Sequence, residues 1–211
     1  MCRWTKWDGS GRERWYLDHS SHHVFYFRHY ISGAGYQKSE SNQLILNFKK
    51  GINAPESQLY YKNRAIERFA EDILILVKRL KNPCYMTWIP PSKAKNDDLY
   101  DDRVKKVVER VCERMKNISP VELVENILTR DSLHGGNLRD PNEIASNWRW
   151  ISYNLDKYRQ AIIVDDVLTT GASFKALHDL IRARGFSGRI NGVFWAFVMD
   201  DVPFTIDSLE Q

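Results

Sequence analysis

The chain has 211 residues, 43% of them hydrophobic, and its 31 lysines and arginines against 27 aspartates and glutamates give a net charge of +4. This length and apolar content fit one domain, or a domain with a small subdomain, around a real core. The net charge is small and the charged residues of both signs are interspersed, so the composition does not indicate a nucleic-acid-binding groove. We expect neither a signal peptide nor a membrane span, because no apolar run approaches about 20 residues. Three widely spaced cysteines favour free thiols in a reducing cytoplasm.

The N-terminal region, residues 1–58, is predicted to form a small β-hairpin hood. Residues with high β propensity dominate "HHVFYFRHYI" (22–31), and "NQLILNFKK" (42–50) reads as a second strand. A turn-rich stretch over 32–41 connects them. The many aromatic side chains of this region offer two interpretations, a stacking platform for a base or simple packing onto the core, and packing is the favoured one.

Residues 59–211 are predicted to form the core of an α/β fold, in which helices flank a parallel twisted sheet. The predicted elements are a helix over 59–80, a strand over 84–90, a helix over 104–115, a strand over 121–130, a strand over 161–164, a helix over 173–184 and a strand over 190–199. Their alternation is typical of a parallel sheet covered on both faces. Ligands of such sheets bind beyond the carboxyl ends of the strands, which draws attention to the loops at 90–98 and 165–173. The long polar segment at 131–147 is expected to be a mobile loop that acts as a lid.

The stretch "AIIVDDVLTTGAS" (161–173) carries the clearest chemistry, because a buried strand runs into two adjacent carboxylates, Asp165 and Asp166. Such a pair can grip the vicinal hydroxyls of a ribose, directly or through the water shell of a hard metal ion. A turn that is rich in hydroxyls follows and leads into a helix, where backbone N–H groups can surround a phosphate. The residues of this turn are Thr169, Thr170, Gly171, Ala172 and Ser173. The alternative to a ligand site is that Asp165 and Asp166 form an ordinary polar strand end and that the turn only caps the helix.

"IIVDDVLTTGAS" resembles the phosphoribosyl-pyrophosphate (PRPP) signature of type I phosphoribosyltransferases. More narrowly, "WIPPSKAKNDDLYDDR" (88–103) and "ILTRDSLHGGNLRDPNEIASNW" (127–148) sit where the ComF-like branch has its pyrophosphate loop and its mobile loop. The resemblance covers about residues 84–200 and implies the type I phosphoribosyltransferase fold. Residues 1–58 do not resemble the cysteine-rich zinc module with which ComF proteins begin.

The resemblance implies an enzyme that transfers the phosphoribosyl group of PRPP to an unidentified acceptor, expected to be a nitrogenous base, and releases pyrophosphate. Asp165 and Asp166 would hold the ribose hydroxyls and Mg²⁺, and residues 169–173 would hold the 5-phosphate. The other implied residues are Ser92 and Lys93 in the pyrophosphate loop, Lys93, Lys95 and Arg103 as charges for the leaving group, and Arg130 and Arg139, which flank the lid.

Two further interpretations stay open. The same site could belong to a non-catalytic module that binds PRPP or a nucleotide and controls a protein or nucleic-acid partner, although the charge does not support extensive nucleic-acid contact. A homodimer is one alternative for the oligomeric state.

The segment "DHSSHH" (18–23) gathers oxygen and imidazole donors that zinc accepts, from Asp18, His19, His22 and His23. Their spacing matches no trusted motif, and no fourth ligand is evident. A solvated turn before a strand is therefore the favoured interpretation of this segment.

Overall fold

The computed structural model describes residues 3–9, 16–130, 140–151 and 154–199. Its strands are β1 (Thr5–Lys6), β2 (His23–Ile31), β3 (Cys84–Trp88), β4 (Ile118–Pro120), β5 (Val124–Asn126), β6 (Trp148–Trp150), β7 (Gln160–Leu168) and β8 (Arg189–Met199). Its helices are α1 (Glu40–Phe48), α2 (Glu56–Val77), α3 (Arg103–Arg114), α4 (Pro141–Ser146) and α5 (Ala172–Ala183). Within this part of the chain, none of the helices is long and apolar enough to cross a membrane.

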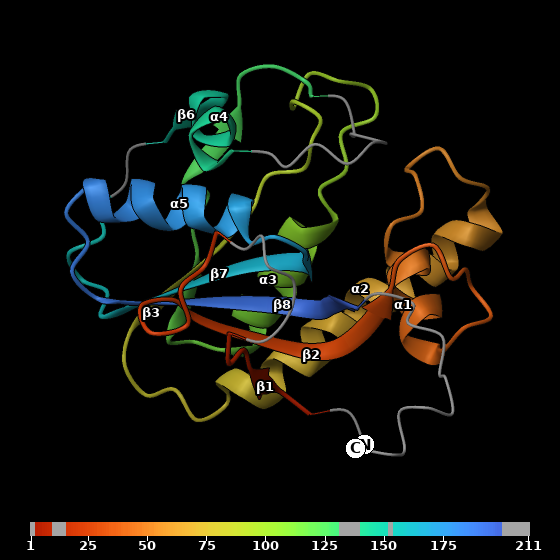
Figure 1. Cartoon of the computed structure of the whole chain (residues 1–211), viewed down its shortest axis with the longest axis horizontal. Coiled ribbons are helices and arrows are strands. Elements are labelled where there is room, and N and C mark those ends of the chain that lie inside the picture. The colour runs from red at the N-terminus through yellow and green to blue at the C-terminus, as the bar shows by residue number, and fades with distance from the viewer. Residues whose placement is uncertain (1–2, 10–15, 131–139, 152–153, 200–211) are drawn as a thin grey trace, which may run out of the picture.

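A six-stranded sheet with the order β1-β2-β8-β7-β3-β4 forms the centre of the molecule, and every pairing except that of β1 with β2 is parallel. Figure 1 shows α5 across one face of this sheet, with α1, α2 and α3 on the other side. The predicted α/β fold with a parallel sheet flanked by helices is confirmed.

Alternate residues of the central strands supply two separate cores, one on each face of the sheet. Ile163 of β7 and Phe194 of β8 pack in the cluster that contains the apolar face of α5. Ile162 and Trp195, their neighbours in the sequence, pack with α1, α2 and α3. Because both faces are covered, β7 is apolar on nearly every residue up to its acidic doublet, as expected for a central parallel strand.

The strand predicted over 42–50 is wrong, because this segment forms helix α1. The side chain of Ser39 caps the helix by accepting a hydrogen bond from the backbone N–H of Asn42. Ile45 and Phe48, three residues apart, are buried on one face of the helix. A short apolar run carries little information about its period, and here the cap decides in favour of the helix.

Strand β2 pairs with β8 in parallel, so it belongs to the main sheet, and β1 rather than 42–50 forms the antiparallel partner at its other edge. The boundary predicted between 1–58 and 59–211 stays a prediction.

The region after α3 also differs from the prediction. The edge strand of the main sheet is β4, and the part of 121–130 that is extended, β5, pairs instead with β6 in a separate two-stranded sheet. The segment predicted as a lid contains the short helix α4, while residues 131–139 lie outside the described part of the chain. Strand β7 continues to Leu168, so both carboxylates of the doublet lie within a strand.

Candidate functional site

A cavity of about 440 Å³ opens at the carboxyl ends of β3 and β7, where the sequence predicts the ligand site. The predicted residues that line it are Ser92, Arg103, Arg130, Asp165, Asp166, Thr169 and Ser173. Residues from segments far apart in the sequence thus meet at one edge of the sheet. The cavity also receives Lys49, which follows α1 and was not expected there because its segment was predicted as a strand.

The two carboxyl groups of the acidic doublet line the same cavity but have different surroundings. Asp165 accepts a hydrogen bond from the backbone N–H of Asp166 through Oδ1, at 2.8 Å. Burial, and then the negative charge of Asp166, raise the pKa of Asp165 to about 8. Burial acts in the same direction on Asp166, but the positive charges of Lys49 and Arg103 outweigh it and hold the pKa of that carboxyl below its usual value.

Arg103, predicted to face the leaving group, is paired with two carboxylates of the protein itself. Its Nη2 lies 3.0 Å from Oδ2 of Asp166 and its Nη1 lies 2.9 Å from Oδ2 of Asp101. Asp101 is in turn bound by Lys62, whose Nζ lies 2.6 Å away. Burial works against the charge of the guanidinium, and the two carboxylates more than compensate, so the pKa of Arg103 is raised.

The doublet offers a donor set that fits Mg²⁺, which prefers carboxylate oxygens and keeps several of its waters. Both carboxylates line a cavity that is open enough for such a hydrated ion. A metal ion bound at Oδ2 of Asp166 would displace the guanidinium of Arg103, which now lies 3.0 Å from that atom. Displacement would free that positive charge for an anionic ligand in the same cavity.

The turn that follows β7 divides into an open side and a covered side. Thr169 and Ser173 line the cavity. Gly171, at the N-terminus of α5, has a φ of +75°, and a Cβ atom on it would lie 2.4 Å from Cγ of Leu17. The backbone N–H of Tyr16 donates to the carbonyl of Thr170 at 3.0 Å.

The N-cap residue of α5, Gly171, has no capping side chain, and the N–H of Ala172 donates to Oγ1 of Thr170 at 3.4 Å. The dipole at this N-terminus favours an anion near Ser173. Ala172, next to it, is buried. The roles predicted for residues 169–173 toward a phosphate stay predictions.

The pyrophosphate-loop segment is held in place by the residues that precede the lid. The carbonyl of Ser92 accepts a hydrogen bond from the backbone N–H of Arg130 at 2.8 Å, and the side chain of Asn126 donates to the carbonyl of Pro91. Arg130 also lines the cavity. Arg139, the other arginine predicted to flank the lid, lies outside the described residues.

The lysines predicted nearby point to other partners. Lys93 does not line the cavity, and its Nζ lies 3.9 Å from a carboxylate oxygen of Asp97. Lys95 is bound by Glu122 at 2.9 Å and Glu125 at 3.0 Å. Of the residues predicted in this loop, therefore, Ser92 lines the cavity, and Lys93 and Lys95 do not.

The N-terminal aromatic residues divide between core and surface. Trp7 and Phe27 are buried, which confirms the packing interpretation for these two rings.

Comparison with known proteins gives structural neighbours and no sequence family. No family model and no curated protein matches the sequence. Among solved structures, the chain is similar to a hypoxanthine phosphoribosyltransferase from Staphylococcus aureus, with 13% identity, a TM-score of 0.40 and coverage of 64% of this chain and 73% of the other. It is also similar to the adenine phosphoribosyltransferase from Thermoanaerobacter pseudethanolicus, with 14% identity, a TM-score of 0.40 and coverage of 68% and 84%.

A third similar structure is the hypoxanthine phosphoribosyl transferase from Trypanosoma cruzi, with 14% identity, a TM-score of 0.34 and coverage of 67% and 68%. All of these scores lie below 0.5, and the assignment of function rests instead on the residues that line the cavity. The ComF-like branch stays a prediction.

Proposed function

We propose that the protein is a cytoplasmic, Mg²⁺-dependent phosphoribosyltransferase of the type I family, in its ComF-like branch, which transfers the phosphoribosyl group of PRPP to a nitrogenous base. One observation carries this proposal. The acidic doublet of β7 and the hydroxyl-bearing residues Thr169 and Ser173, which follow it, line the same cavity. A ribose 5-phosphate presents a diol and a phosphate a few bonds apart, and this cavity offers a partner to each.

In this proposal Asp165 and Asp166 hold the ribose hydroxyls and the metal ion. Mg²⁺, when bound, neutralises charge on the pyrophosphate. Thr169, Ser173 and the N-terminus of α5 bind the 5-phosphate, because hydroxyls donate hydrogen bonds to phosphate oxygens and the helix dipole favours an anion there.

The cations of the cavity serve the leaving group. Arg103, Lys49 and Arg130 surround the space next to the doublet, and positive charge there stabilises the charge that develops as the bond from the anomeric carbon to pyrophosphate breaks. The segment at 131–147, with Arg139, is assigned the role of a lid that excludes water, since water would hydrolyse PRPP.

A non-catalytic PRPP or nucleotide sensor is the second candidate, and the state of the doublet favours it. Asp166 is neutralised by two basic side chains of the protein itself, Arg103 at 3.0 Å and Lys49 at 3.8 Å. Ligand binding would rearrange these ion pairs, and such a rearrangement is sufficient to signal occupancy without any transfer.

The deciding experiment follows pyrophosphate release from PRPP and Mg²⁺, with and without a panel of nitrogenous bases, alongside calorimetric binding of PRPP. Base-dependent release supports the transferase, whereas binding without release supports the sensor. The double variant Asp165→Asn, Asp166→Asn should lose PRPP binding and keep its fold by circular dichroism. Asp98→Asn, an exposed carboxylate outside the cavity lining, is the matched control. Unchanged affinity in the double variant would remove both candidates.

A further inference from the structure

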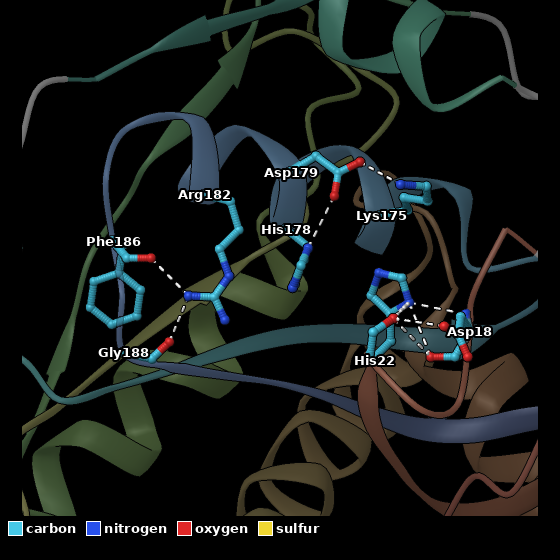
Figure 2. Close-up of polar contacts among 9 residues, drawn as sticks. Asp18, His22, Lys175, His178, Asp179, Arg182, Phe186 and Gly188 are labelled. Carbon is cyan, nitrogen blue, oxygen red and sulfur yellow. Dashed lines mark hydrogen bonds and ion pairs between the residues drawn. The ribbon is translucent and has the colours of Figure 1, made fainter.

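Two imidazoles and a carboxylate converge where the segment before β2 packs against α5, and none of the three lines the cavity described above. Candidate ligand atoms of His22, His178 and Asp179 all lie within 4.8 Å of one another. His178 and Asp179 are neighbours on α5, while His22 comes from the loop before β2, and Figure 2 shows its ring between Asp18 and the two α5 side chains. The fold thus assembles this cluster from residues more than 150 positions apart in the sequence.

We propose that His22, His178 and Asp179 bind a Zn²⁺ ion, which fastens the segment before β2 to helix α5. Zinc takes imidazole nitrogen and carboxylate oxygen ligands at about 2.0–2.2 Å in a tetrahedral arrangement, which places ligand atoms about 3.3 Å apart. Nδ1 of His178 and Oδ1 of Asp179 are 3.1 Å apart, close to that spacing. Small side-chain movements would bring in the third ligand, and the fourth position is left for water.

The donor set distinguishes this cluster from the acidic doublet. Imidazole suits zinc and related transition metals, whereas Mg²⁺ prefers an all-oxygen shell. The inference therefore does not rest on the proposed function, and it concerns a different ion.

The surroundings of His22 suit a ligand whose ring is held in orientation by a partner. Its Nδ1 atom accepts a hydrogen bond from the backbone N–H of Asp18 at 3.0 Å and lies 3.2 Å from the carbonyl oxygen of the same residue. Zinc binding at Nε2 would require the ring proton to move to Nδ1, where that carbonyl would accept it. A ligating histidine usually has such a partner on its other nitrogen. The side chain is also well buried, at 8% exposure for the residue, so few alternative orientations are open to it.

A lysine already pairs with one of the proposed zinc ligands, Asp179. Nζ of Lys175 lies 2.5 Å from Oδ2 of Asp179, so the ion would share or replace this ammonium.

The ion would act on the phosphate turn through the segment that it fastens. The residues just before His22 cover that turn, since Leu17 lies against Gly171 and Tyr16 donates to Thr170. Zinc bound between His22 and α5 would hold this cover in place. The competing explanation is aromatic packing, because the ring of Phe174 lies 6.0 Å from that of His22 and 5.7 Å from that of His178.

Metal titration separates the two explanations. The metal-free protein, prepared with a chelator, is titrated with Zn²⁺ against a chromophoric competitor, and Co²⁺ is used as a spectroscopic probe of tetrahedral geometry. We expect one equivalent of each ion to bind. His22→Ala and His178→Ala should each weaken Zn²⁺ binding by about tenfold or more, while His23→Ala, the adjacent imidazole, should leave it unchanged.

Two further measurements keep the test decisive if the alanine variants fold poorly. Asp179→Asn changes a half-exposed side chain and should also weaken Zn²⁺ binding without loss of fold. In hydrogen exchange, Zn²⁺ should slow the amides of residues 16–22, including that of Tyr16. The absence of a stoichiometric site, or Zn²⁺ binding that survives His178→Ala and Asp179→Asn, would overturn the site. Binding with unchanged exchange would overturn the fastening role.

Discussion

Replacing Asp165 by asparagine should make the ligand-free protein more stable. Asparagine has nearly the same shape and keeps the Oδ1 atom that accepts the hydrogen bond from the backbone N–H of Asp166. It removes a carboxyl group that burial and the charge of Asp166 make costly to ionise. The variant is therefore expected to gain stability while it loses the ability to bind the ligand, which is the trade-off that functional sites commonly show.

The size of this gain follows from the difference in pKa between the two states. An unfolded aspartate has a pKa of about 3.9, and each unit of upward shift on folding costs about 1.4 kcal/mol once the pH exceeds the folded value. Folding raises the pKa of Asp165 to about 8. Since Asp165 faces an open cavity in which water can relieve part of the cost, we expect about 1–3 kcal/mol at pH 8.

The pH dependence gives the sign of the effect. A carboxyl group whose pKa is raised on folding costs nothing below its unfolded pKa and becomes progressively more costly as the pH rises through the folded value. The advantage of Asp165→Asn should therefore be largest at pH 8 and smaller at pH 5.

Urea denaturation with a chelator present, at both pH values, measures the free energy of unfolding of each variant. Asp166→Asn is the matched control, and we expect the opposite sign, because Arg103 and Lys49 lose the carboxylate with which they pair. A neutral or destabilising effect of Asp165→Asn at pH 8, or the same effect at both pH values, would refute the reasoning.

Three other changes test the fold around the site. Gly171→Ala should lower the free energy of unfolding in urea by at least about 1 kcal/mol, because φ is +75° and the new Cβ would lie 2.4 Å from Cγ of Leu17. An unchanged urea midpoint would contradict the packing of Leu17 against this turn. Asp72→Ala should lower the free energy of unfolding by about 3–5 kcal/mol in the same assay, because the Asp72 carboxylate, 1% exposed, lies 3.0 Å from the buried guanidinium of Arg28. A decrease below about 1 kcal/mol would argue against this ion pair. Burial raises the pKa of Cys84 to about 12, so its alkylation at pH 8, followed by mass spectrometry, should be roughly a thousandfold slower in the native protein than in urea; equal rates would show that the thiol is accessible.

The sequence predicts the sheet and the doublet because their signals are local. A continuous apolar run ending in "DD" and a hydroxyl-rich turn place β7, the carboxylates and the start of α5 within a few residues of their observed positions. The parallel order follows from alternating elements, since a strand, a helix and a second strand can pack in few ways.

What the sequence does not predict depends on contacts between distant segments. Lys49 reaches the cavity only because Ser39 caps a helix where a strand was expected. The proximity of His22 to His178 and Asp179 of α5 depends on where the fold places the segment before β2. No local pattern in "DHSSHH" contains this information.

The parallel pairing of β2 with β8 has a consequence for shortened forms of the protein. Eight residue pairs join these two strands, from His23 opposite Asn191 to Ile31 opposite Met199. A chain starting at residue 59 would expose the backbone N–H and C=O groups of β8 along this length, together with the apolar side chains now covered by α1. Unprotected strand edges of this kind recruit other chains, so such a fragment should self-associate even though every residue of the acidic doublet and its turn would still be present.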